Sequence, residues 1–195
     1  MRIHASAAGG IALIAVLWLP PLRAALESGM ATHMLLQLPL LALAGSLFAG
    51  PLRRSVESLQ DRLDRSGIAL ALVAVLASSY WMLPRALDAA LADPWMETAK
   101  FLTLPLLVGL PARLCAPRLS ALAAGFVIAN LLSMLAVVGW LYSSFPARLC
   151  NYYLLDQQVI AGTALLWISG ALAVLWLSTF FIGAPYPAER YGAPV

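Results

Sequence analysis

The segment Met30–Gly50 constrains the fold more than any other, because it is a long apolar run without a charged side chain. An α-helix needs about 20 such residues to cross the hydrocarbon core of a bilayer. The segment also carries His33, the only histidine beyond the extreme N-terminus, between Met30 and Met34. Since residues three or four apart share one helix face, these side chains and Gln37 are expected to lie together. An imidazole in a membrane span is costly unless it has a partner, a proton or a metal.

The composition indicates an integral membrane protein. Hydrophobic residues make up 62% of the chain and charged residues 11%, whereas soluble domains carry about 25% charged residues. The basic pI near 9.1 comes from loop arginines. The sequence has no basic stripe with interleaved aromatic residues, so nucleic-acid binding is not expected. The two cysteines, Cys115 and Cys150, are too few for a disulfide framework. Because no nucleophile–base pair, carboxylate pair or familiar catalytic motif is visible, an enzyme is not expected.

The apolar runs predict an all-α fold, a polytopic transmembrane helical bundle of about six spans. Residues 1–183 are interpreted as one transmembrane domain, and residues 184–195 as an irregular, proline-rich tail. The fourth span contains Pro105 and Pro111, so it is expected to be kinked or partly re-entrant. The spans are expected at Ala5–Leu22, Met30–Gly50, Gly67–Leu83, Thr98–Leu114, Leu119–Tyr142 and Asp156–Ile182.

Two segments have alternative interpretations. The first apolar run could be a signal peptide, but Trp18, Pro20 and Pro21 are unusual in such a peptide and favour an uncleaved span. Residues 51–66 are the most polar segment, and they predict either a cytoplasmic amphipathic helix on the membrane surface or a solvated loop.

The distribution of basic residues predicts that both termini are cytoplasmic. Eight of the twelve Lys and Arg residues then lie on the inner side, and Arg23, Arg85, Lys100 and Arg148 lie on the outer side. The expected location is a bacterial inner membrane, which the chain would cross several times. No ionisable side chain is expected deep in a span and no inverted repeat is visible, which disfavours a transporter.

Several soft side chains are expected at the outer end of the bundle. With His33, they suit Cu(I), which prefers thioether, thiolate and imidazole ligands. Asp156, Gln157 or Asn151 is expected to lie within hydrogen-bonding reach of the imidazole. In a metal site, Asp156, Gln157 and Gln37 would orient the imidazole by hydrogen bonds without binding the metal themselves. The alternative is that these polar groups only lock the second and sixth spans together. The predicted metal ligands are His33, Met34, Met30, Cys150 and Met82.

Two stretches carry a family resemblance. His33-Met34 with Gln37, and Asp156-Gln157-Gln158-x-x-x-Gly162 followed by Trp167, resemble the CtaG-type assembly factors of caa3-type cytochrome c oxidase, which are polytopic membrane proteins. The resemblance implies an inner-membrane accessory factor for a haem–copper oxidase that handles copper, as Cu(I), at the periplasmic face. Its partners would be cytochrome c oxidase subunits or a periplasmic copper chaperone, besides the lipid bilayer.

This chain departs from the family at two of those positions. Gln37 stands where the family tends to have a second histidine, and Leu166 where it tends to have methionine. The family also has more histidines and usually one more span. A non-catalytic structural subunit of a membrane complex, with no metal site, is therefore the alternative function.

Overall fold

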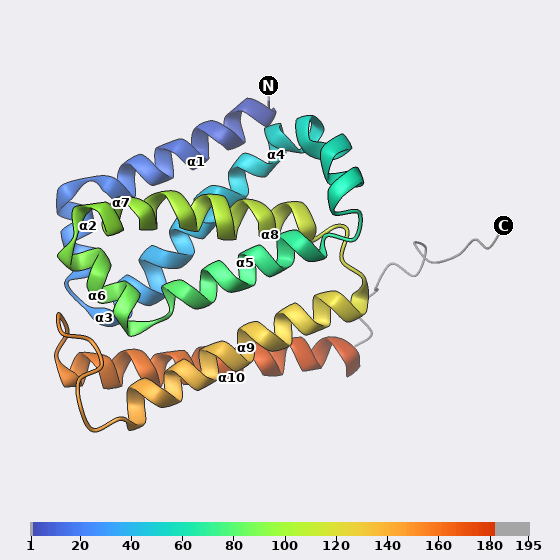
Figure 1. Cartoon of the computed structure of the whole chain (residues 1–195). Coiled ribbons are helices and arrows are strands. Elements are labelled where there is room, and N and C mark those ends of the chain that lie inside the picture. The colour runs from blue at the N-terminus through green and yellow to red at the C-terminus, as the bar shows by residue number, and fades with distance from the viewer. Residues whose placement is uncertain (1, 182–195) are drawn as a thin grey trace.

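The computed structural model describes residues 2–181, which fold into a bundle of helices (Figure 1). This confirms the predicted all-α fold. In chain order the elements are α1 (Arg2–Trp18), α2 (Pro20–Glu27), α3 (Met30–Thr32), the π-helix η1 (His33–Gln37), α4 (Leu38–Leu63), α5 (Ile68–Trp81), α6 (Pro84–Ala92), α7 (Pro94–Thr103), the π-helix η2 (Leu104–Gly109), α8 (Leu110–Cys115), α9 (Ala121–Ser144) and α10 (Leu155–Phe181).

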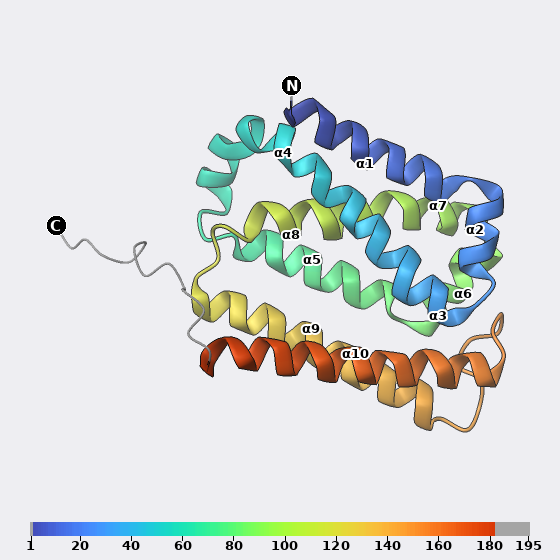
Figure 2. The same cartoon turned by 180° about the vertical axis from the view of Figure 1, so that it is seen from behind.

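The long helices run roughly along one direction and form successive layers. Helix α1 lies along α4 on one side of the bundle, α5 and the continuous α7–η2–α8 helix form the middle, and the α9–α10 hairpin lies on the opposite side (Figures 1 and 2). The short helices α2, α3 and α6 and the α9–α10 loop gather at one end. We call this end the polar end, because most interhelical hydrogen bonds described below lie there.

The helices are long and apolar enough for several membrane crossings. Four stretches qualify directly: Met30–Leu52, Pro94–Cys115, Ala121–Ser144 and Leu155–Phe181. Two bent pairs, Ser6–Trp18 with Pro20–Glu27 and Ile68–Trp81 with Pro84–Ala92, raise the number to six if each pair is one span. The predicted count of about six lies within this range, while the orientation of the termini stays a prediction.

Prolines determine where the helices at the polar end begin. Leu19, Leu83 and Asp93 each precede a proline and have ψ angles of 128°, 135° and 120°. A residue before proline disfavours the helical conformation because the proline ring clashes with its backbone. The chain therefore leaves one helix and starts another with proline in its first turn. The resulting bends are 72° between α1 and α2 and 70° between α5 and α6.

The predicted fourth span, Thr98–Leu114, was too short. The helix begins at Pro94 and continues to Cys115 through η2, so its prolines widen the helix instead of interrupting it. The two π-helices η1 and η2 each end two residues before a proline, Pro39 and Pro111. A proline ring collides with the carbonyl group one turn earlier, and a wider turn relieves this collision.

The predictions for the more polar segments have different outcomes. Residues 51–63 are helical as a continuation of α4, so the helical interpretation of that segment is confirmed, and its contact with the membrane surface stays a prediction. At the start of the chain, α1 packs along α4, while the choice between span and signal peptide stays untested. The predicted tail, residues 184–195, lies outside the described residues.

Helix α4 crosses η2 at very short range because each of them has a glycine at the crossing. A Cβ atom on Gly109 would overlap the carbonyl oxygen of Ala42, and one on Gly45 would overlap the carbonyl group of Pro105. The two backbones are thus in direct contact. The crossing lies more than two helical turns from Gln37 and Lys100, on the helices that continue η1 and α7, so it helps to set the spacing of those helices.

We expect Gly109→Ala to separate α4 from η2 and to lower the free energy of unfolding, towards the upper end of the about 1–3 kcal/mol typical of overpacking. Gly170→Ala in α10 is the matched control, because a Cβ there meets no atom within 4 Å and alanine favours a helix by about 0.5–1 kcal/mol over glycine. Thermal unfolding in detergent measures both variants. Equal midpoints for the two would contradict the close crossing.

Candidate functional site: a buried lysine cluster

Lys100 is placed inside the bundle by the way α7 begins. The Asp93 side chain accepts a hydrogen bond from the Trp95 backbone N–H at 3.0 Å, which caps the helix, and Pro94 starts it. Lys100 follows six residues later, about 9 Å along the axis at the usual rise per residue. One turn farther on, Thr103 Oγ1 accepts a hydrogen bond from Trp81 Nε1 at 2.9 Å, which ties α7 to α5.

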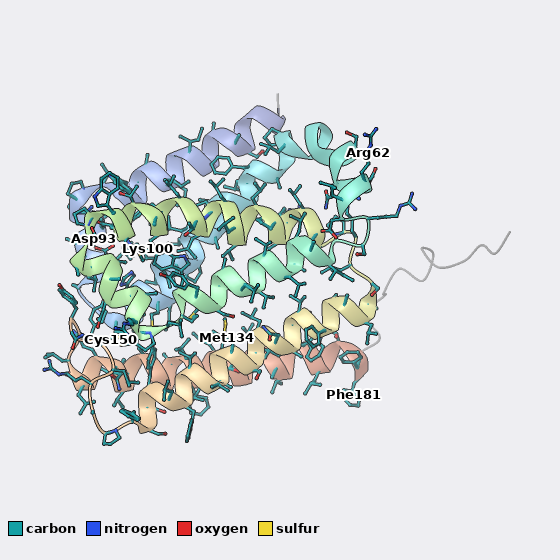
Figure 3. The ribbon with its side chains drawn as sticks, viewed as in Figure 1. Arg62, Asp93, Lys100, Met134, Cys150 and Phe181 are labelled. Atoms are coloured by element: carbon teal, nitrogen blue, oxygen red, sulfur yellow. The ribbon has the colours of Figure 1, made fainter. Side chains whose placement is uncertain are left out.

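The Lys100 side chain is completely buried and has three polar partners. Its Nζ lies 2.6 Å from Glu27 Oε1, 3.1 Å from His33 Nε2 and 3.1 Å from Gln37 Oε1. Figure 3 shows Lys100 directed into the space between α7 and the helices behind it. An ammonium group has three N–H donors and no acceptor. Three acceptors around one nitrogen therefore match the charged form of lysine, with every donor used.

The remaining polar atoms form a closed hydrogen-bond network. Gln37 Nε2 donates to Glu27 Oε1 at 3.0 Å. Because His33 Nε2 accepts from Lys100, Nδ1 carries the ring proton and donates to the Tyr153 hydroxyl at 2.8 Å. The Tyr153 hydroxyl in turn donates to the Glu27 backbone carbonyl at 3.1 Å. We call Glu27, His33, Gln37, Lys100 and Tyr153 the Lys100 cluster.

The Tyr153 hydroxyl keeps its proton in this environment. Burial raises its pKa above the ordinary value, and the nearby Glu27 carboxylate raises it further. The hydroxyl can therefore donate to the Glu27 carbonyl while accepting from His33. This fixes the tautomer of His33, with the proton on Nδ1.

The charges around the cluster cancel. Glu27 pairs with Lys100, and Arg23 Nη1 lies 2.9 Å from Glu97 Oε1 as a second ion pair. Glu97 Oε1 accepts no aligned hydrogen bond from any described residue, so its contact with Arg23 is mainly electrostatic. The desolvation of an unpaired charge in such an environment would cost roughly several kcal/mol of free energy. Two cations and two anions make the site neutral overall.

The predicted partners of His33 were wrong, although its burial among polar groups was expected. Its ring nitrogens contact Tyr153 and Lys100. Asp156 is exposed at the start of α10, and Gln157 Nε2 reaches only the Ser28 carbonyl at 3.5 Å.

Asn151 belongs to a separate contact between the α9–α10 loop and α6. Its backbone N–H and side-chain amide both donate to Asp88 Oδ2, at 2.7 and 3.0 Å. Gln158 organises the same loop from α10: its Oε1 accepts from the Leu149 N–H at 2.7 Å, and its Nε2 donates to the Tyr142 carbonyl at 3.2 Å.

The predicted sulfur ligands lie at the polar end, but the imidazole nitrogens bond to other groups. Met34 and Met82 line an apolar crevice of about 420 Å³, and Met30 is fully buried in the hydrophobic core. Among the described residues, no group of three or more His, Cys, Asp or Glu side chains could hold a metal ion. Copper binding stays a prediction, and at His33 it requires that Lys100 or Tyr153 be displaced.

Cys150 is a buried thiol in the α9–α10 loop. Its Sγ donates weakly to the Pro84 carbonyl at 3.8 Å. Burial, assisted by the Asp88 carboxylate, raises the pKa of Cys150 to about 12. At neutral pH this side chain is therefore a thiol and not the thiolate that binds copper well.

The sequence interpretation missed Lys100, Glu27 and Tyr153. Lys100 was counted among the outer basic residues, near the start of the predicted span Thr98–Leu114, and its complete burial among polar partners was not expected. The useful sequence pattern was Asp93-Pro94, an N-cap followed by proline, which starts the helix before Thr98 and so places Lys100 farther from the helix start.

The chain matches no protein-family model, no curated protein and no solved structure.

We expect Tyr153→Phe to destabilise the fold by about 1–3 kcal/mol, because it leaves a buried ring N–H of His33 and the Glu27 carbonyl without their partner. Tyr152→Phe is the matched control, since Tyr152 is its chain neighbour and is largely exposed. Chemical or thermal unfolding in detergent compares the two variants. An equal loss of unfolding free energy in the two variants would contradict the hydrogen bonds assigned to Tyr153.

Cys150 is expected to resist alkylation in the folded protein. Its pKa of about 12, against the ordinary 9.0, reduces the thiolate fraction about 1,000-fold, and the thiolate is the reactive form. Maleimide labelling at pH 8, followed by mass spectrometry, should show modification only after denaturation. Because the folded pKa is the higher one, this thiol also makes the folded state lose stability as the pH rises from about 9 to about 12. Rapid labelling in the folded state would contradict the burial.

Proposed function

We propose that this chain is a non-catalytic accessory protein of a membrane complex, and that the Lys100 cluster fixes its helices in one arrangement. The observation that carries this proposal is the closed network around Lys100: both ring nitrogens of His33 and all three donors of the ammonium have partners within the chain. Such a cluster offers no free base, nucleophile or ligand atom at the imidazole.

The cluster connects segments that are far apart in sequence. Glu27 comes from α2, His33 and Gln37 from η1, Lys100 from α7, and Tyr153 from the loop before α10. All of them must be docked before each polar group is satisfied. Fully satisfied polar networks rigidify a core, whereas partly satisfied ones are costly. This supports a structural role for the cluster.

The α9–α10 hairpin presents a broad apolar surface. The bilayer accounts for such a surface, and a partner helix can also pack on it through van der Waals contacts. The partner that we propose is a haem–copper oxidase, on the basis of the resemblance of the His33 and Asp156 segments to its assembly factors. The large apolar side chains of these two helices that are more than half exposed are Leu122, Phe126, Val137, Trp140, Ile160, Trp167, Val174, Leu175, Phe180 and Phe181.

The test separates a structural role from copper delivery. Deleting the gene in the parent cell should lower the amount of assembled oxidase, and added copper should not restore it. Purified protein should show no Cu(I) uptake that depends on His33. In the cell, Cys150→Ser should keep assembly, because Cys150 lies outside the Lys100 cluster, while Tyr153→Phe should lower it together with the protein's stability.

Two results would reject parts of this proposal. Restoration of assembly by copper, together with about one Cu(I) per chain lost in His33→Ala, would establish copper handling instead. Unchanged oxidase levels after deletion would remove the oxidase as the partner while leaving the structural role of the cluster to the unfolding measurements.

A further inference from the structure

We propose that Glu27, His33 and Gln37 form a cation-binding site, and that the Lys100 ammonium is its permanent, covalently attached occupant. The site would accept a divalent metal ion such as Zn²⁺ once the ammonium is removed. This inference does not depend on the proposed function, because it concerns only the chemistry of the donor atoms.

The three acceptors converge on one point. A carboxylate oxygen, an imidazole nitrogen and an amide oxygen lie 2.6, 3.1 and 3.1 Å from the Lys100 nitrogen. Imidazole nitrogen and carboxylate oxygen are standard ligands of Zn²⁺ and similar divalent ions, whereas Cu(I) favours sulfur. The ammonium therefore stands at the position that a small cation would take among these ligands.

The acceptors also have hydrogen bonds that do not involve Lys100: His33 bonds to Tyr153, and Glu27 and Gln37 bond to each other. His33 Nδ1 donates to Tyr153, which leaves Nε2 directed at the site. A metal-binding histidine is usually oriented in this way, by a hydrogen bond from its second nitrogen. Gln37 is held by its bond from Nε2 to Glu27, so its Oε1 also faces inward. His33 and Gln37 are four residues apart in η1, and both side chains are buried and contact the Lys100 nitrogen.

Electrostatics favour a replacement cation. Arg23, Glu27, Glu97 and Lys100 together carry no net charge in their paired forms. Removing the ammonium leaves one negative charge in a buried site and a space where the lysine side chain was. An uncompensated buried charge is strongly destabilising, so the free energy of binding a cation there is favourable. Water molecules could complete the coordination in that space.

Metal uptake by purified full-length protein in detergent tests this inference, with a purification tag that contains no histidine. After incubation with Zn²⁺ and desalting, bound metal is counted by mass spectrometry. The wild type should hold no His33-dependent Zn²⁺, and Lys100→Ala should hold about one ion per chain. The matched control, Lys100→Ala combined with His33→Ala, should bind at least ~10-fold more weakly. Lys100→His adds a third strong ligand and should bind more tightly than Lys100→Ala.

Each outcome decides the question. A folded Lys100→Ala protein without His33-dependent uptake overturns the inference, as does one His33-dependent Zn²⁺ in the wild type. If Lys100→Ala does not fold alone, Zn²⁺ should raise its thermal midpoint or its folded yield, and that of Lys100→His, but not that of the double variant. Failure of Zn²⁺ to stabilise either single variant also overturns the inference.

Discussion

The ion pair between Lys100 and Glu27 is the interaction on which the polar end of the bundle depends. A lysine within a membrane helix is tolerated only if its charge is balanced and its donors are satisfied. The bend after α1 brings Glu27 to the site, η1 brings His33 and Gln37, and the proline-initiated α7 carries Lys100 inward. The bend between α1 and α2 thus brings the short helix α2, with Glu27, over the buried charge.

Hydropathy predicted the helical fold and the approximate position of the four long apolar helices, because the bilayer favours both. The burial of His33 followed from the cost of an imidazole in hydrocarbon. Its partners were not predictable in the same way. Lys100 and Tyr153 are separated from His33 by 67 and 120 residues, and no local pattern joins them. The count of basic residues on each side of the membrane also gave no sign that Lys100 is buried, because it treats every lysine near the end of a span as a loop charge.

The sulfur ligands show a second limit of sequence reasoning. Position along the membrane normal follows from the place of a residue within its apolar run, so Met30, Met34, Met82 and Cys150 were correctly expected near one end. The direction of each side chain around its helix follows from packing instead. There, Met34 and Met82 line an apolar crevice, Met30 fills the core and Cys150 contacts the start of α6. Methionine is an adaptable core residue, and these methionines fill apolar space between the helices.

The polar end also determines where the α9–α10 hairpin sits. Two apolar crevices, of about 490 and 420 Å³, border the hairpin where it faces the rest of the bundle. At the polar end, by contrast, Tyr153 joins His33, Asp88 holds Asn151, and the Tyr142 hydroxyl donates to the Met82 carbonyl at 3.1 Å. Apolar contacts between helices gain little in lipid, because acyl chains are equally apolar. Hydrogen bonds at one end therefore carry a large share of the docking, and the Lys100 cluster, through Tyr153, couples the hairpin to the buried charge.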